Sequence, residues 1–393
     1  MKIAIFSDTY YPQVNGVVSV VDRSAAILSA RGHDVALFVA SGDAEQALNA
    51  RGHRVPITFF HSIPAFVYPG ERVAWPYDRD VLQELWAFAP DVIHFHTPFG
   101  VGRAALRAAE KNDVAIVGTH HTFFDQYLSH VKLDKQAWAQ RLAWKGTVRL
   151  YNRADLVISP SHILADSLRE HGLRTNMRTV PNSVDTKRFR PASAEEKTVL
   201  KQQYGLPDNM SFVYMGRMSE EKSVDVVLRA FSEVHAQLPH AVLMLVGSGP
   251  AERQLRTLTE ELGIADAVRF TGTLRGDELA EAVRANNIFV TASATENMPI
   301  SVLEGMASGL PVVGVQERGM RELVRHGENG FLSEAGDYMS FSADMVMLAT
   351  DVVLCTRMGR TARATVKRFG EDAFGDALEE AYTECIEKHR NST

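Results

Sequence analysis

Two glutamates, Glu296 and Glu304, are separated by seven residues in the stretch TENMPISVLEG. A carboxylate accepts hydrogen bonds from neighbouring hydroxyl groups, such as those of a ribose or a hexose. If the chain is helical from Ile300 onward, the two carboxylates lie on the order of 10 Å apart, which suits two ends of one elongated polar ligand. The N-terminus of that helix can face an anion. The alternative is an ordinary solvent-exposed helix face, although Glu304 has apolar neighbours.

Arg217 stands at the end of a predicted buried strand at 211–217, and Lys222 lies in the loop that follows it. A guanidinium group binds two oxygens of a phosphate at once, and an ammonium group acts as a point charge. Together they suit a diphosphate. The alternative is an exposed loop in which these groups are ordinary surface charges.

Two glycines follow predicted strands and two histidines end one. Gly16 precedes the first predicted helix, where a residue without Cβ lets a phosphate or sugar approach the backbone. Gly249 stands in Gly-Ser-Gly-Pro, an incomplete dinucleotide-binding motif, and for each glycine taken alone plain turn geometry is the favoured interpretation. His120 and His121 end the strand 114–119, where an imidazole can donate or accept a hydrogen bond at neutral pH.

Two further histidines, His94 and His96, occupy alternate positions at the end of the strand 91–96 and therefore share one face. The spacing is compatible with a metal, but no acidic residue accompanies them, so we expect them to line a core or a cleft. Asp78-Arg79-Asp80 spells a motif of some metal-dependent transferases, but it does not follow a clear strand, and we interpret it as chance.

Short strands rich in valine and isoleucine alternate with amphipathic helices, which predicts parallel sheets covered on both faces. The first series has strands at 3–6, 34–40, 91–96, 114–119 and 154–161, with helices at 17–30 and 102–111. The second has strands at 211–217, 241–247 and 287–293, with helices at 224–238, 251–262, 277–284 and 300–307. Periodicity fades between 181 and 210, which we interpret as the domain junction. Ligands of such folds bind outside the carboxyl ends of the strands, here in the cleft between two domains.

The composition fits a two-domain globular protein. The chain has 393 residues, of which 45% are hydrophobic and 23% charged. Its net charge of −6 does not favour nucleic-acid binding. Only two cysteines occur, so a zinc site or disulfide framework is not expected. No apolar stretch approaches about 18 residues and no signal peptide is recognisable, so we expect a cytoplasmic protein.

One stretch departs from this acidic average. Between residues 132 and 153 basic and aromatic residues alternate, with Asp134 as the single acidic residue. Such a stretch is typical of contact with an anionic membrane surface. The alternative is a pair of helices that pack their tryptophans inward and leave their cations in water. The expected contact residues are Lys132, Lys135, Trp138, Arg141, Trp144, Lys145 and Arg149.

These motifs, taken in order, resemble the family-4 class of retaining glycosyltransferases. The resemblance extends over essentially the whole chain, from Asp8-Thr9-Tyr10-Tyr11-Pro12 through the histidine motif at 119–122 to the glutamates. It implies the GT-B fold, an α/β architecture of two doubly wound Rossmann-like domains facing across a cleft. The expected acceptor-binding domain is 1–187 and the nucleotide-sugar domain is 188–370. The segment 371–393 is an expected helix that returns to the first domain.

The resemblance also implies roles for individual residues. Arg217 and Lys222 would bind the nucleotide diphosphate and stabilise it as the leaving group, and Glu304 would hold the ribose hydroxyls. Glu296 and His121 would contact the donor sugar. The expected substrate-binding residues are Gly16, Gly249, Asn297, Met298, Pro299 and Glu304. Pro299 departs from the Phe-Gly of many members, and it removes one backbone donor because proline has no N–H.

Within the family, His121-Thr122-Phe123-Phe124-Asp125-Gln126-Tyr127 followed by a basic helix resembles the branch that glucosylates diacylglycerol. The expected reaction therefore moves glucose from UDP-glucose to a membrane lipid such as diacylglycerol, by an enzyme peripheral on the inner face of the membrane. A soluble or polysaccharide-building acceptor is the alternative. Neither a metal nor pyridoxal phosphate is expected, and the nucleotide sugar is a substrate.

Three other classes are less favoured. An NAD-dependent oxidoreductase requires a complete glycine motif and an acidic residue about 20 positions later, and the chain lacks both. A glycan phosphorylase requires a lysine that binds pyridoxal phosphate. A non-catalytic sugar-nucleotide-binding protein would not need both the cationic pair and His121.

Overall fold

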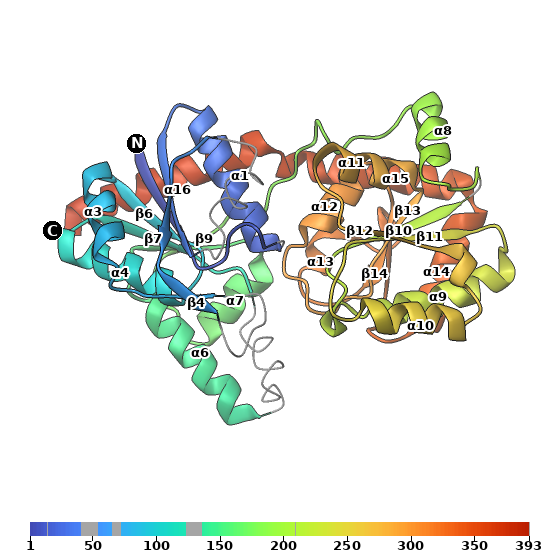
Figure 1. Cartoon of the computed structure of the whole chain (residues 1–393), viewed down its shortest axis with the longest axis horizontal. Helices are drawn as coiled ribbons and strands as arrows, with labels where there is room; N and C mark the ends of the chain where they lie inside the picture. The colour runs from blue at the N-terminus through green and yellow to red at the C-terminus, as the bar shows by residue number, and fades with distance from the viewer. Residues whose placement is uncertain (14, 41–53, 65–71, 123–135, 209, 393) are drawn as a thin grey trace. The chain divides into compact units, whose positions relative to one another are not determined.

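The computed structural model describes all residues except 14, 41–53, 65–71, 123–135, 209 and 393 (Figure 1). The chain divides into two compact units. Unit 1 comprises Met1–Asn182 and Asp372–Thr393, and unit 2 comprises Ser183–Glu371. The division lies a few residues before the boundary predicted after residue 187. The C-terminal segment belongs to unit 1.

Unit 1 contains a seven-stranded sheet of order β3-β2-β1-β6-β7-β8-β9, and its strand pairs are parallel. Its strands read as short runs of valine, isoleucine and phenylalanine because both faces are buried. The strands are β1 Lys2–Ser7, β2 Asp34–Ala40, β3 Ile57–Phe60, β6 Val92–Phe95, β7 Ala115–Thr119, β8 Leu156–Ser159 and β9 Met177–Thr179. A separate antiparallel pair joins β4 Ser62–Pro64 to β5 Arg72–Ala74.

Helices cover both faces of this sheet. One apolar cluster joins Phe6, Phe38 and Phe95 of the sheet to side chains of several helices. The opposite face is that of His94, whose ring contacts the C-terminal helix through Tyr382. The helices of unit 1 are α1 Gly16–Ala30, α3 Arg79–Phe88, α4 Gly100–Asn112, α6 Ala137–Tyr151, α7 His162–Glu170 and α16 Glu371–Ser392.

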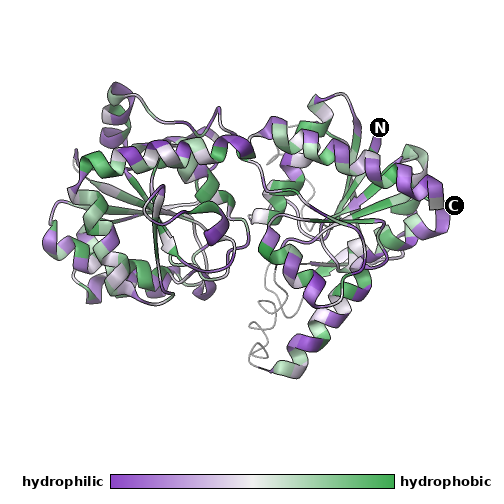
Figure 2. Ribbon diagram, turned by 180° about the vertical axis from the view of Figure 1, so that it is seen from behind, coloured by the Kyte–Doolittle hydropathy of each residue, from purple (hydrophilic) through white to green (hydrophobic). Residues whose placement is uncertain are grey.

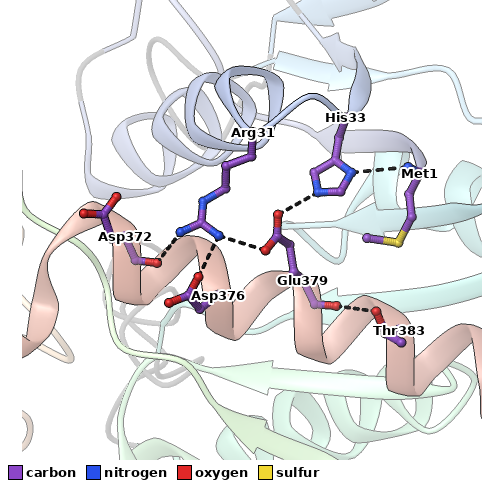
Figure 3. A network of polar contacts seen from close by, with 7 residues as sticks. All are labelled: Met1, Arg31, His33, Asp372, Asp376, Glu379 and Thr383. Carbon is purple, nitrogen blue, oxygen red and sulfur yellow. Dashed lines mark hydrogen bonds and ion pairs between the residues drawn. The ribbon is translucent and has the colours of Figure 1, made fainter.

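Polar side chains hold α16 against the start of the chain (Figure 3). The Arg31 guanidinium donates to Asp376 at 2.7 Å, to Glu379 at 2.8 Å and to the carbonyl of Asp372 at 2.6 Å. His33 also contacts Glu379, at 2.8 Å. These contacts attach α16 to Arg31 and His33 of unit 1.

Unit 2 contains a six-stranded parallel sheet of order β12-β11-β10-β13-β14-β15. In Figure 2 the hydrophobic colour predominates in the strands of both sheets. Separate apolar clusters lie on the two faces, one around Phe231 and Phe341 and the other around Val302 and Ala362. The strands are β10 Ser211–Met215, β11 Val242–Val246, β12 Val268–Gly272, β13 Ile288–Val290, β14 Val312–Val315 and β15 Gly330–Ser333.

Unit 2 also contains α-helices and short 3₁₀ turns. The α-helices are α8 Ala194–Gln203, α9 Val224–Gln237, α10 Glu252–Glu261, α11 Gly276–Ala285, α12 Ile300–Ala307, α13 Met320–Leu323, α14 Tyr338–Thr350 and α15 Val352–Val366. The 3₁₀ turns are η1 Glu220–Lys222, η2 Ala265–Ala267 and η3 Lys367–Phe369.

The stretch 181–210, read from sequence as a junction without periodicity, contains the helix α8. The sequence marks the start of α8 by a capping residue rather than by an apolar face. The Ser193 hydroxyl accepts a hydrogen bond from the backbone N–H of Glu196 at 3.1 Å. Only one face of α8 is buried, at Leu200 and Lys201, so the apolar pattern is too sparse to detect.

Among the described residues, no single helix is long and apolar enough to cross a membrane. Taken together, Tyr338–Thr350 and Val352–Phe369 have the length and apolar composition of a span, but they are bent by 103° at their junction. Phe341, Met345 and Leu348 of this pair are buried in the core of unit 2.

Candidate functional site

The predicted diphosphate-binding residues lie at the carboxyl ends of two adjacent strands of unit 2. β10 pairs with β13 in parallel, with Phe212 beside Ile288. The chain leaves β10 through Arg217 and η1, and it leaves β13 through Glu296 before α12 begins. Parallel pairing therefore brings together two loops that are about 75 residues apart in the sequence.

An ion pair joins these loops. The Lys222 ammonium donates to a Glu296 carboxylate oxygen at 2.7 Å, and the two side chains are 23% and 18% exposed. Burial opposes the charge of Lys222, but the Glu296 carboxylate outweighs it and raises the pKa of the lysine above its ordinary value. Lys222 is therefore a fixed, charged group rather than a proton donor near neutral pH. The pairing also orients Glu296.

Arg217 differs from Lys222 in its surroundings. Its side chain is exposed, and no hydrogen bond or ion pair of its guanidinium is found within the described part of the chain. Its backbone is held, because the Tyr214 hydroxyl donates to the Arg217 carbonyl at 3.0 Å. The structure thus places an available cation on a fixed backbone, in the same loop as Lys222.

The segment between the two glutamates is buried and leads into α12. Asn297 and Met298 are 8% and 5% exposed, and Pro299 is the N-cap residue of α12. An N-cap N–H takes no part in the helical hydrogen bonds, so the proline leaves the helix intact. Glu304 is 8% exposed within α12, which rules out the alternative of a solvent-exposed helix face.

The two predicted glycines have different environments. A Cβ on Gly249 would lie 2.3 Å from the carbonyl oxygen of Met218, so this glycine is needed for two loops of unit 2 to pass each other. A Cβ on Gly16 would have nothing within 4 Å. Open space at the start of α1, whose N-cap Asn15 accepts from Val18, leaves room for a ligand at Gly16. Ligand contact remains a prediction for both.

His121 in unit 1 lies two residues after the end of β7, and it contacts His96, which directly follows the neighbouring strand β6. Its Nε2 is 2.9 Å from Nδ1 of His96, and the two rings stack with centroids 5.2 Å apart. His94 contacts the Tyr382 hydroxyl at 2.8 Å and the Thr119 hydroxyl at 2.6 Å. The expectation that His94 and His96 line a core is confirmed, since both are buried.

Burial keeps these histidines neutral. It lowers the pKa of His94 and of His120 to about 3 and that of His121 to about 4, and it lowers the pKa of His96 well below its ordinary value. An imidazole that stays neutral can offer one donor and one acceptor. His121 is thus suited to hydrogen bonding rather than to acid catalysis. Its pairing with His96 was not predicted, although both histidine pairs end neighbouring strands.

Asp8, part of the opening motif, is buried and caps a helix. One carboxylate oxygen accepts from the backbone N–H of Val101 at 2.8 Å, and the other accepts from the Thr97 hydroxyl at 2.7 Å. These groups start α4, whose own N-cap residue Phe99 supplies no side-chain bond. Burial raises the pKa of Asp8 to about 6, against the effect of the helix N–H groups.

The basic stretch forms α6 over its described part, and Lys132 and Lys135 lie outside the described residues. Trp138 and Leu142 are 61% and 63% exposed. Arg141, Lys145 and Arg149 follow one another at intervals of four residues and are exposed on the same side, since positions four apart share a helix face. No acidic partner of these three cations is found among the described residues. Figure 2 shows hydrophobic and hydrophilic residues alternating along this helix.

One prediction about this stretch is wrong. Trp144 is not a surface residue: it is 6% exposed and stacks on His171 with centroids 4.2 Å apart. The helical period places it on the buried face with Val148 and Tyr151. Arg153 forms a bidentate ion pair with Glu110 and is therefore not an available cation. The surface that we call the α6 face consists of Trp138, Arg141, Leu142, Lys145 and Arg149.

Within the described residues, no group of three or more histidines, cysteines or acidic side chains is arranged to hold a metal ion. The Asp78-Arg79-Asp80 motif has a structural explanation. Asp78 caps α3, its carboxylate accepting from the Val81 N–H, and it also contacts His61 at 2.6 Å. Both cysteines are buried thiols, as expected.

Comparison with known proteins identifies families and relatives that this chain resembles. The family described as "Glycosyltransferase Family 4" matches residues 14–188, and "Glycosyl transferases group 1" matches residues 196–365. A protein of Mycobacterium tuberculosis described as GDP-mannose-dependent alpha-mannosyltransferase is 31% identical over 86% of this chain and 85% of its own length. Alpha-monoglucosyldiacylglycerol synthase of Streptococcus pneumoniae is 29% identical over 80% of this chain and 70% of its own length.

A solved structure of similar fold is that of Anabaena Alr3699/HepE in complex with UDP-glucose. It superimposes with a TM-score of 0.79 at 21% identity, covering 98% of this chain and all of the other. The two doubly wound units are those of the GT-B fold. The chain therefore belongs to the family-4 glycosyltransferases, enzymes that transfer a sugar with retention of its anomeric configuration.

Proposed function

We propose that this glycosyltransferase moves glucose from UDP-glucose to a hydroxyl group of a membrane lipid such as diacylglycerol. The observation that carries the lipid assignment is the α6 face, which exposes two large apolar side chains among three cations. An aromatic residue among lysines and arginines suits the boundary between lipid headgroups and acyl chains. Each cation near an anionic surface contributes about 1 kcal/mol.

The donor assignment rests on the cationic loop of unit 2 and on two comparisons. Arg217 and Lys222 supply two positive charges at the end of β10, as a diphosphate requires. The solved HepE complex contains UDP-glucose, and the pneumococcal relative is named for a glucosylated lipid. We expect Glu304 to hold the ribose and Glu296 and His121 to contact the glucose.

The proposed chemistry needs no metal and no other cofactor. The acceptor oxygen forms a bond to the anomeric carbon on the face from which the diphosphate departs. The bond from that carbon to the phosphate oxygen breaks, and the departing oxygen takes the proton of the acceptor hydroxyl. Arg217 and Lys222 stabilise the charge that develops on the diphosphate.

A second candidate has its own support. The mycobacterial relative is named a GDP-mannose-dependent mannosyltransferase, and its sequence identity to this chain is 31%, against 29% for the pneumococcal relative. This alternative changes the donor, and it leaves the acceptor open to soluble or polysaccharide-building sugars.

Vesicle flotation and a donor screen test both assignments. We expect the protein to float with vesicles containing phosphatidylglycerol but not with pure phosphatidylcholine. Reversing the three charges of the α6 face, as Arg141→Glu, Lys145→Glu and Arg149→Glu, should abolish flotation. The matched control reverses three exposed cations elsewhere in unit 1, as Arg103→Glu, Lys111→Glu and Arg174→Glu, and should still float.

The donor screen compares nucleotide release from UDP-glucose, UDP-galactose, UDP-N-acetylglucosamine and GDP-mannose. UDP-glucose should be used most rapidly. Equal flotation of the two triple variants would contradict the α6 face as the contact, and preferred use of GDP-mannose would contradict the donor.

A further inference from the structure

Two histidines of unit 1, the buried His96 and the half-buried His121, share a hydrogen bond, and the surroundings indicate which of the two rings donates it. His96 is 2% exposed and follows β6, and its backbone N–H donates to the Phe6 carbonyl at 2.9 Å, which fixes its position. His121 follows β7, the next strand of the sheet. The contact joins Nδ1 of His96 to Nε2 of His121 at 2.9 Å. One of these nitrogens must carry the proton.

The other ring nitrogen of His96 indicates whether His96 or His121 donates this hydrogen bond. Its Nε2 is buried, and no hydrogen-bond partner for it is found within the described part of the chain. If His121 donated, the proton of a neutral His96 would sit on Nε2 as a buried N–H without an acceptor. Buried N–H groups left without a partner are rarer than buried acceptors left without one. The favoured arrangement puts the proton of His96 on Nδ1.

The consequence for His121 follows from its neutrality. If its Nε2 accepts the hydrogen bond from His96, its own proton must lie on Nδ1. We infer that His96 is a positioning residue that donates to Nε2 of His121 and thereby makes Nδ1 of His121 a hydrogen-bond donor toward the sugar. This inference deepens the proposed function, because it relies on the proposed contact of His121 with the donor sugar.

A second pair of contacts holds the ring of His96 in place. The His94 ring lies against it with centroids 4.1 Å apart. Both nitrogens of His94 are engaged, with the Tyr382 hydroxyl at 2.8 Å and the Thr119 hydroxyl at 2.6 Å. Tyr382 of the C-terminal helix thus holds His94, which in turn packs on the ring of His96.

The direct test is nuclear magnetic resonance of protein carrying ¹³C,¹⁵N-labelled histidine, in which the ring-carbon shifts distinguish the two neutral tautomers. The signal of His121 is identified by its loss in His121→Gln. We expect the proton on Nδ1 in the native protein and on Nε2 in His96→Leu. A native His121 protonated on Nε2, or one unchanged by His96→Leu, would overturn the inference.

Kinetics separate positioning from packing. His96→Leu should lower kcat about 10- to 100-fold, because a misplaced contact group costs up to about 100-fold. His96→Asn should restore most of the loss, because its amide nitrogen can donate from near the Nδ1 position. Equal losses in His96→Asn and His96→Leu would overturn the inference.

The two proposals fail in different ways. If His121 has the expected tautomer but His121→Gln keeps full activity, the proposed contact with the sugar is wrong. In that case the effect of His96 on the His121 tautomer still stands, because the spectra establish it without any activity measurement.

Discussion

At the scale of single residues, the proposed donor site depends on a contrast between Arg217 and Lys222. Lys222 is already paired with Glu296, whereas the Arg217 side chain is exposed. Arg217→Ala should therefore leave the fold unchanged and lower kcat/KM by at least about 100-fold, as loss of a charge-stabilising donor does. Arg253→Ala, on the exposed side of α10, is the matched control and should keep native kinetics. Similar kinetics for the two variants would contradict the assignment of Arg217.

The buried histidines predict how the stability of unit 1 depends on pH. Below the ordinary histidine pKa of 6.5, histidines of the unfolded chain bind protons. In the native state the lowered pKa values prevent this protonation at His94, His96, His120 and His121. The free energy of unfolding therefore falls as the pH falls. Asp8 acts in the opposite direction, since its pKa is raised to about 6 and its native carboxyl binds a proton more readily. The combined effect of the four histidines on the free energy of unfolding exceeds the opposite effect of Asp8. The free energy of unfolding should drop by up to about 4 kcal/mol between pH 7.5 and 5.5.

Urea titration followed by tryptophan fluorescence measures this change. All four tryptophans belong to unit 1, at positions 75, 86, 138 and 144, so the signal reports that unit alone. A urea midpoint that stays constant or rises on acidification would show that the histidines titrate normally.

At the scale of elements, the attachment of α16 predicts the effect of Gly375→Ala on stability. Helix propensity alone would predict an effect of the opposite sign. Alanine is favoured over glycine within a helix by about 1 kcal/mol. A Cβ at Gly375 of α16, however, would lie 2.3 Å from Nε of Arg31, which is held by three hydrogen bonds (Figure 3). Gly375→Ala should therefore destabilise unit 1 by about 1 kcal/mol, because the Arg31 contacts must shift.

The double variant supplies the control. With Arg31→Ala already present, the obstacle is gone, and Gly375→Ala should then stabilise the protein by about 1 kcal/mol. Urea titrations of the four proteins give the comparison, and the same effect of Gly375→Ala in both backgrounds would contradict the role of Arg31.

The elements also show what the sequence can and cannot predict. The helix predicted at 300–307 matches α12, and the α/β alternation predicts both sheets, because buried parallel strands and amphipathic helices leave strong local patterns. α8 leaves no such pattern, because only one of its faces is buried. Trp138 and Trp144 are the same residue type in the same stretch. Which of them is buried depends on which face of α6 packs against the rest of unit 1, and the sequence does not determine this.

At the scale of the whole molecule, the same limit applies to the sites. The sequence identifies Lys222 and Glu296 separately as candidate site residues. They form an ion pair because β10 and β13 are neighbours in the sheet, and this strand order is not visible in the sequence. His96 and His121 are brought together in the same way by β6 and β7. Residues that meet across a sheet are thus predictable as candidates, and their partners are not.

The most direct test of the account is the product formed from UDP-glucose and diacylglycerol in phosphatidylglycerol vesicles. We predict release of UDP together with a glucosylated lipid whose anomeric proton, observed by nuclear magnetic resonance, shows the α configuration of the donor. Lys222→Met should abolish product formation. Glucose transfer to water or to a soluble sugar only, or no product from UDP-glucose where GDP-mannose gives one, would contradict the proposed reaction.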